Sequence, residues 1–111
     1  MRKAHKKQAE KLLRLLDQVH EGIRTELEAD RKQEALELLG QCQDAAIQLG
    51  ETIEESEGEG FTAVRLLEVY CEQLYQYYEK IRLGEDFSAE KVYKHLHESL
   101  IQIENSVKND I

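Results

Sequence analysis

The sequence contains no proline, no tryptophan, only two cysteines and no long apolar run. A transmembrane helix needs roughly 20 apolar residues in succession, and the longest uninterrupted apolar stretch here spans only a few. The start of the chain also lacks the apolar stretch of a secretory signal peptide. We therefore expect a soluble, cytoplasmic protein.

The two cysteines, Cys42 and Cys71, are too few for a zinc site without clustered histidines. Both occupy apolar positions of predicted helices. If these helices form a hairpin that turns near Glu59, the two cysteines are offset by about 7.5 Å along the axis. A disulfide would then need a shifted register, so we interpret both residues as buried free thiols.

The net charge of -8 is unevenly distributed. Six cations against Glu10 give the first 14 residues a charge of +5, whereas residues 21–60 carry -9. A negatively charged body repels nucleic-acid phosphates, and no recognised nucleic-acid motif is present. We therefore expect no nucleic-acid partner.

Apolar residues recur at alternating steps of three and four in four segments, which is the spacing of helices with one buried stripe. The predicted helices span residues 3–28, about 30–56, 62–82 and 88–108. Short connectors favour antiparallel neighbours. The sequence thus predicts an all-α, antiparallel up-down bundle of about four helices, forming one domain over residues 1–111 with little room for a chemical site.

The boundaries of these helices rest on local signals. Asp30 followed by Gln33 resembles a capping box, Thr62 and Ser88 are candidate N-caps, and Gly84 is expected to close the third helix. Glycines at 58 and 60 mark the clearest break. The alternative architecture is a long helical hairpin or coiled coil in which residues 3–55 form one helix, roughly 80 Å long.

Several polar pairs have the spacing of metal ligands. Asp17 with His20, and His95 with Glu98, stand three residues apart, as in dimetal bundles. The proposed inward positions of the second and third helices carry no further carboxylates. Four acids flank the glycine break without a calcium-loop pattern: Glu54, Glu55, Glu57 and Glu59. We interpret all of these as solvated residues and predict no metal and no cofactor.

A histidine phosphotransfer role is the enzyme-like alternative. Residues 20–25 resemble the histidine box of sensor kinases, but they contain an inserted glycine and the chain lacks the proline of that box. His97 followed by Glu98 is a second match to that box, limited to these two residues. Neither site has the lysine-glycine pair typical of phosphotransfer domains.

A basic stripe lies along the first helix: Lys3, Lys7, Lys11 and Arg14. Such a stripe can contact an anionic membrane surface, in which case the protein would be peripheral to the membrane. The absence of aromatic anchors on this helix weakens that interpretation. We favour instead a polar face paired with acids of a neighbouring helix or another protomer.

Four tyrosines surround the third helix too widely for one stripe to bury them all: Tyr70, Tyr75, Tyr77 and Tyr78. Tyrosine is favoured at interfaces because its ring buries area while its hydroxyl remains paired. These residues are candidates for a dimer or domain contact, and the alternative is an ordinary bundle edge.

Five segments together carry a resemblance to a known family: MRKAHKKQAE at 1–10, QCQ at 41–43, EGEGF at 57–61, LLEVYCE at 66–72 and SLIQIENSVKNDI at 99–111. They resemble the helical N-terminal region of bacterial proteins with a CDP-glycerol glycerophosphotransferase-like domain, which are associated with teichoic-acid-type polymer synthesis. The segments contain no catalytic motif of that family.

The resemblance implies that this chain is the N-terminal module of a longer protein whose transferase chemistry resides downstream. We therefore expect no catalytic residues here, and a helical domain that positions or oligomerises the transferase domain. Its partners would be that downstream domain or a second copy of the chain. The alternative function is a stand-alone helical adaptor or histidine phosphotransfer protein.

Overall fold

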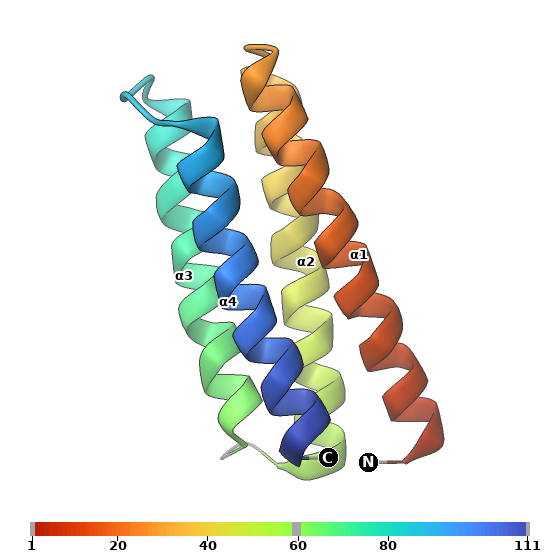
Figure 1. The fold of residues 1–111 in the computed structure, drawn as a ribbon. Coiled ribbons are helices and arrows are strands. Elements are labelled where there is room, and N and C mark those ends of the chain that lie inside the picture. The colour runs from red at the N-terminus through yellow and green to blue at the C-terminus, as the bar shows by residue number, and fades with distance from the viewer. Residues whose placement is uncertain (1, 59–60, 111) are drawn as a thin grey trace.

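The computed structural model describes residues 2–58 and 61–110, apart from the side chains of residues 109 and 110. It contains four helices, α1 (Lys3–Glu28), α2 (Lys32–Glu57), α3 (Thr62–Arg82) and α4 (Ala89–Asp110) (Figure 1). The predicted all-α bundle of four helices is confirmed.

The helices run alternately up and down in a bundle that measures 42 × 21 × 19 Å. Helix α1 packs against α2 and α4, and α3 packs against the same two helices. Among the described residues, the diagonal pairs α1/α3 and α2/α4 have no Cα atoms within 8 Å of each other. The two ends of the chain and the α2–α3 connection lie at one end of the bundle (Figure 1).

The core is a single cluster of buried apolar side chains from all four helices. Its members follow the spacing of three and four that the sequence shows, because that spacing places them on one face of each helix. The members of this cluster with no measurable exposure are Leu16, Ala35, Cys42, Leu49, Ile53, Ala63, Tyr70, Leu96, Leu100 and Ile103.

The turn between α1 and α2 differs from the predicted capping box. Asp30 has a φ of 57°, in the left-handed region. The N–H of Arg31 donates to the carbonyl of Glu26 at 2.8 Å, and that of Asp30 donates to Leu27 at 3.1 Å. This is a Schellman end for α1. Asp30 therefore ends the first helix, the N-cap of α2 is Arg31, and the alternative of one continuous helix over residues 3–55 is wrong.

The other helix ends agree in part with expectation. Gly84 has a φ of 73° and closes α3 as predicted, and Ser88 accepts a hydrogen bond from the N–H of Lys91 at 3.4 Å. Thr62 is the first residue of α3 rather than its cap, which is Phe61. In the predicted break, Gly58 has a φ of 96°, and residues 59 and 60 lie outside the described residues.

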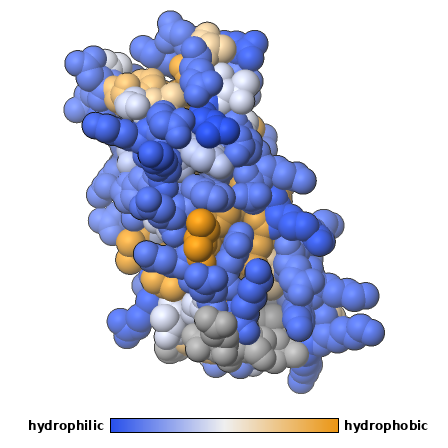
Figure 2. Space-filling view, in the orientation of Figure 1, coloured by the Kyte–Doolittle hydropathy of each residue, from blue (hydrophilic) through white to orange (hydrophobic). Residues whose placement is uncertain are grey.

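The surface is mainly polar. Figure 2 shows a face dominated by hydrophilic side chains, with small separate apolar areas. Isolated apolar residues are ordinary on protein surfaces. Within residues 2–58 and 61–110, none of the helices has the length and apolar content needed to cross a bilayer.

Two glycines inside helices occupy contrasting surroundings. A Cβ atom added at Gly22 of α1 would lie 3.1 Å from Cδ1 of Leu38 on α2, so this glycine permits the close approach of the two helices. A Cβ atom added at Gly40 of α2 would meet no atom within 4 Å. The surface of α2 is therefore open at Gly40.

This contrast predicts different effects of the same substitution. Gly40→Ala should raise the free energy of unfolding by about 0.5–1 kcal/mol, because alanine is the better helix former and has space. Gly22→Ala should gain less or lose stability, because Leu38 must move. Urea unfolding of both variants measures the difference, and equal gains would contradict this account of the α1–α2 contact.

Candidate functional site

The seam between α1 and α4 carries a row of linked polar side chains. A hollow of about 260 Å³ also lies on this seam, lined by Glu10, Leu13, Arg14, Asp17, Glu104 and Lys108. The Tyr93 ring stacks on His97 with centroids 5.3 Å apart, and its hydroxyl donates to Glu21 at 2.6 Å. The guanidinium of Arg24 lies 4.0 Å from the centre of the Tyr93 ring and 2.5 Å from Glu21. His97 approaches Asp17 at 3.5 Å. The hydrogen bond from Tyr93 lowers the pKa of Glu21.

Two further seams also carry polar links. Between α3 and α4, the Tyr77 hydroxyl is 2.6 Å from Nδ1 of His95, and Ser99 donates to Gln73 at 2.8 Å. Between α1 and α2, His5 lies 3.5 Å from Glu55. These contacts tie neighbouring helices together at the surface.

The seam between α2 and α3 is different. No surface hydrogen bond or ion pair joins these two helices in the described part of the chain. Instead, two hollows follow each other along the seam and share Gln43. One, of about 270 Å³, is lined by Leu39, Gly40, Gln43, Leu74, Tyr75, Tyr78 and Glu79. The other, of about 370 Å³, is lined by Gln43, Ala46, Ile47, Gly50, Glu51, Glu54, Val64, Leu67, Glu68 and Cys71. We call the two together the α2–α3 groove.

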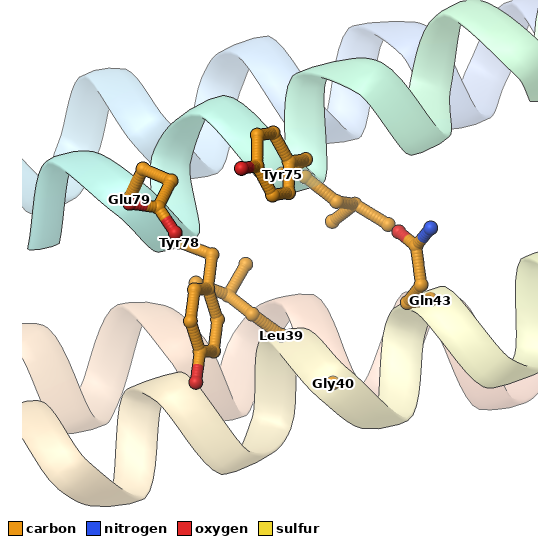
Figure 3. Close-up of a pocket in the computed structure, with 7 residues that line it drawn as sticks. Leu39, Gly40, Gln43, Tyr75, Tyr78 and Glu79 are labelled. Atoms are coloured by element: carbon orange, nitrogen blue, oxygen red, sulfur yellow. The ribbon is translucent and has the colours of Figure 1, made fainter. Parts of the chain in front are cut away.

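Figure 3 shows the first hollow of this groove. The ring of Tyr78 reaches from α3 toward α2, and the side chain of Gln43 rises from α2 toward α3. Gly40 presents bare backbone between them, which leaves the floor open (Figure 3). Tyr75 is 63% exposed, and Ile47 in the second hollow is 47% exposed. The groove is therefore an apolar surface that the bundle itself leaves uncovered.

The four predicted interface tyrosines fall in different places. Tyr75 and Tyr78 line the groove, whereas Tyr77 faces α4 through its contact with His95. Tyr70 is fully buried. The expectation that Tyr70 takes part in an interface is therefore wrong, because its position lies on the core face between Leu67 and Leu74.

The basic stripe of α1 is exposed along its whole length, at Lys3, Lys7, Lys11 and Arg14. The sequence favours a pairing of these cations with acids of a neighbouring helix or of another protomer. Among the described residues, no side-chain ion pair involves any of the four. The stripe is thus available for a partner or an anionic surface outside the bundle.

A polar cluster lies in the centre of the core. His20 of α1 is fully buried, and its Nε2 forms a hydrogen bond with the Tyr70 hydroxyl. The Tyr70 hydroxyl also interacts electrostatically with the thiol of Cys42 on α2. One side chain from each of three helices therefore meets here, across the diagonal between α1 and α3.

The buried position decides the protonation of this cluster. Burial lowers the pKa of His20 to about 4, and the charge of His97 adds to this effect. Burial raises the pKa of Cys42 to about 12 and raises that of Tyr70. At neutral pH the imidazole is neutral and the thiol is protonated, so Cys42 is not a nucleophile. The cluster is a structural connection.

The candidate metal pairs are not assembled. Asp17 contacts His97 at the surface, while His20 is buried, so the two members of that pair point to different environments. His95 contacts Tyr77, and Glu98 is exposed. Throughout residues 2–58 and 61–110, no three side chains of histidine, cysteine, aspartate or glutamate come together in a way that could hold a metal ion.

The candidate phosphotransfer histidines are also poorly placed. His20 has no exposed surface, so a phosphodonor cannot reach it. The side chain of His97 is 34% exposed, but its Nδ1 atom is buried. The stacked ring of Tyr93 covers one side of the imidazole.

Sequence analysis missed the inward placement of His20 and Tyr70, although the signal was present. His20 stands four residues after Leu16 and three before Ile23, and both of these are core residues. Tyr70 has the same relation to Leu67 and Leu74. The spacing of three and four therefore predicts an inward position for both residues, although both side chains carry polar atoms.

Comparison with known proteins provides no relative for this chain: no family model, no curated protein and no solved structure matches it.

The buried histidine predicts an acid-sensitive fold. Because the pKa of His20 is about 4 in the folded chain and about 6.5 when unfolded, protonation favours unfolding. The stability that the neutral, buried His20 contributes to the fold is fully present above pH 6.5 and is lost as the pH falls toward 4. Between pH 7 and 4.5, the free energy of unfolding of the unsubstituted chain should fall by roughly 2–3 kcal/mol more than that of His20→Gln. Urea unfolding at both pH values tests this, and equal losses would contradict it.

The two thiols should differ in reactivity. The prediction that both thiols are free and buried is confirmed for Cys42, but its burial part is wrong for Cys71, which is partly exposed and lines the groove. An aromatic disulfide reagent should modify one thiol in the folded protein and two in urea. Cys71→Ser should abolish the native reaction, and Cys42→Ser should retain it. Native modification of Cys42 would contradict the burial described here.

Proposed function

We propose that this chain is a non-catalytic interaction domain that binds another protein domain through the α2–α3 groove. The observation that carries this proposal is the contrast between the seams. Three pairs of neighbouring helices are linked by polar contacts at the surface, while the fourth exposes apolar side chains and bare helix backbone. Exposed apolar surface of this kind is typical of protein–protein contact sites.

The resemblance to bacterial CDP-glycerol glycerophosphotransferase-like proteins supports a more specific role. In that role the bundle positions or oligomerises a downstream glycerophosphotransferase- or glycosyltransferase-like domain during the synthesis of cell-wall polymers. The exposed basic stripe of α1 fits a location beside an anionic membrane surface. A histidine phosphotransfer role has less support, because His20 is buried and His97 is stacked against Tyr93.

Photo-crosslinking in the cells that produce the protein tests the interaction role. A photoreactive phenylalanine analogue replaces Tyr75 in the groove, and a matched chain carries it at Lys94, which is exposed on α4. We expect a defined adduct from position 75 that is absent from position 94, identified by mass spectrometry of the linked peptides. Adducts with a transferase domain would support the specific role.

Equal labelling from both positions, or no adduct from position 75, would overturn the assignment of the groove as the contact surface.

A further inference from the structure

The two ends of the α2–α3 groove differ in charge. At the first hollow, the only carboxylate is Glu79, and Arg82 pairs with it at 2.6 Å. At the second hollow, three carboxylates line the walls: Glu51, Glu54 and Glu68. None of these three has an ion pair in the described part of the chain, and no lysine or arginine lines either hollow. The groove is therefore apolar at one end and acidic at the other.

The dimensions of the groove suit a helix. Its lining on α2 runs from Leu39 to Glu54, which corresponds to about 22 Å along the helix axis. A helix of about 15 residues has the same length. Gly40 and Gly50 lower the α2 wall in both hollows, so a neighbouring backbone can approach closely.

We propose that the groove binds an amphipathic helix of a partner protein, with lysine or arginine residues at one end of its apolar stripe. The apolar stripe packs on Tyr75 and Tyr78. The cations lie beside Glu51, Glu54 and Glu68. This inference rests on the proposed function and names the chemistry of the partner.

A second copy of this chain fits the groove less well. If two grooves met face to face, the unpaired carboxylates of one copy would lie against either those of the other copy or its apolar end. Both arrangements are unfavourable, and each copy carries a net charge of -8. The basic stripe of α1 cannot fill the groove of another copy, because the apolar residues of that helix are buried in its own core.

Two designed peptides test the chemistry of the occupant. Both have 18 residues and the same leucine stripe, and one end of the stripe is flanked by lysines in the first peptide and by glutamates in the second. Fluorescence anisotropy measures their affinity for the intact chain. We expect the lysine peptide to bind at least about tenfold more tightly, and this preference to shrink at high salt.

Matched charge variants locate the effect. In E51K/E68K the preference for the lysine peptide should fall to within about twofold. E85K/E98K makes the same change in net charge at exposed positions away from the groove, and it should retain the preference.

Alkylation of Cys71, which lines the second hollow, should slow at least about fivefold with saturating lysine peptide, because the bound helix covers it.

The outcomes separate this inference from the proposed function. If both peptides bind equally and protect Cys71, the charge assignment is overturned while the interaction role stands. If E85K/E98K loses the preference as E51K/E68K does, the effect is one of net charge and the inference also fails. Dimers that crosslink through Tyr75 would identify a second copy as the occupant and overturn the inference. Failure of the interaction role itself appears separately, as the absence of adducts from position 75 in cells.

Discussion

The hydrogen bond between His20 and Tyr70 crosses the centre of the core and joins two helices on a diagonal of the bundle. Helices on a diagonal of the bundle have no close backbone contact, yet this pair joins α1 to α3 through the centre of the core. Tyr70 also contacts Cys42, which brings in α2. Burying an unpaired polar group is costly, so this contact favours the rotation of α1 and α3 that pairs Nε2 of His20 with the Tyr70 hydroxyl, while Nδ1 of His20 has no hydrogen-bond partner among the described residues. The apolar core supplies most of the stabilisation around it.

The rotation of the helices in turn decides what each seam presents to solvent. With His20 and Tyr70 inward, Glu21 and Arg24 face Tyr93, and Tyr77 faces His95. These contacts link α4 to both of its neighbours. The same rotation leaves α2 to present Gly40 and Ile47 to the α2–α3 seam. The open groove follows from the packing of the core and is not a separate feature of the surface.

The sequence predicted the helices well and the groove poorly. Helix positions depend on apolar spacing, which is local, and the predicted bounds of 3–28 and 62–82 agree with the structure. The turn at Asp30 was misread because aspartate favours both an N-cap and a left-handed position after a helix. Tyr70 was misassigned because a tyrosine hydroxyl tolerates exposure as well as burial. Whether a seam is sealed depends on residues of two helices far apart in the sequence, which no local pattern contains.

The central claim is that the α2–α3 seam exposes an apolar groove and has no polar link at its surface, whereas polar contacts join the other three seams in the described part of the chain. Carbene footprinting of the purified chain, resolved to single residues by mass spectrometry, tests it most directly. The account predicts strong labelling of Ile47 and Tyr75 and weak labelling of Tyr77 and Tyr93, which are partly covered at the seams on α4. Similar labelling of these four residues would contradict it.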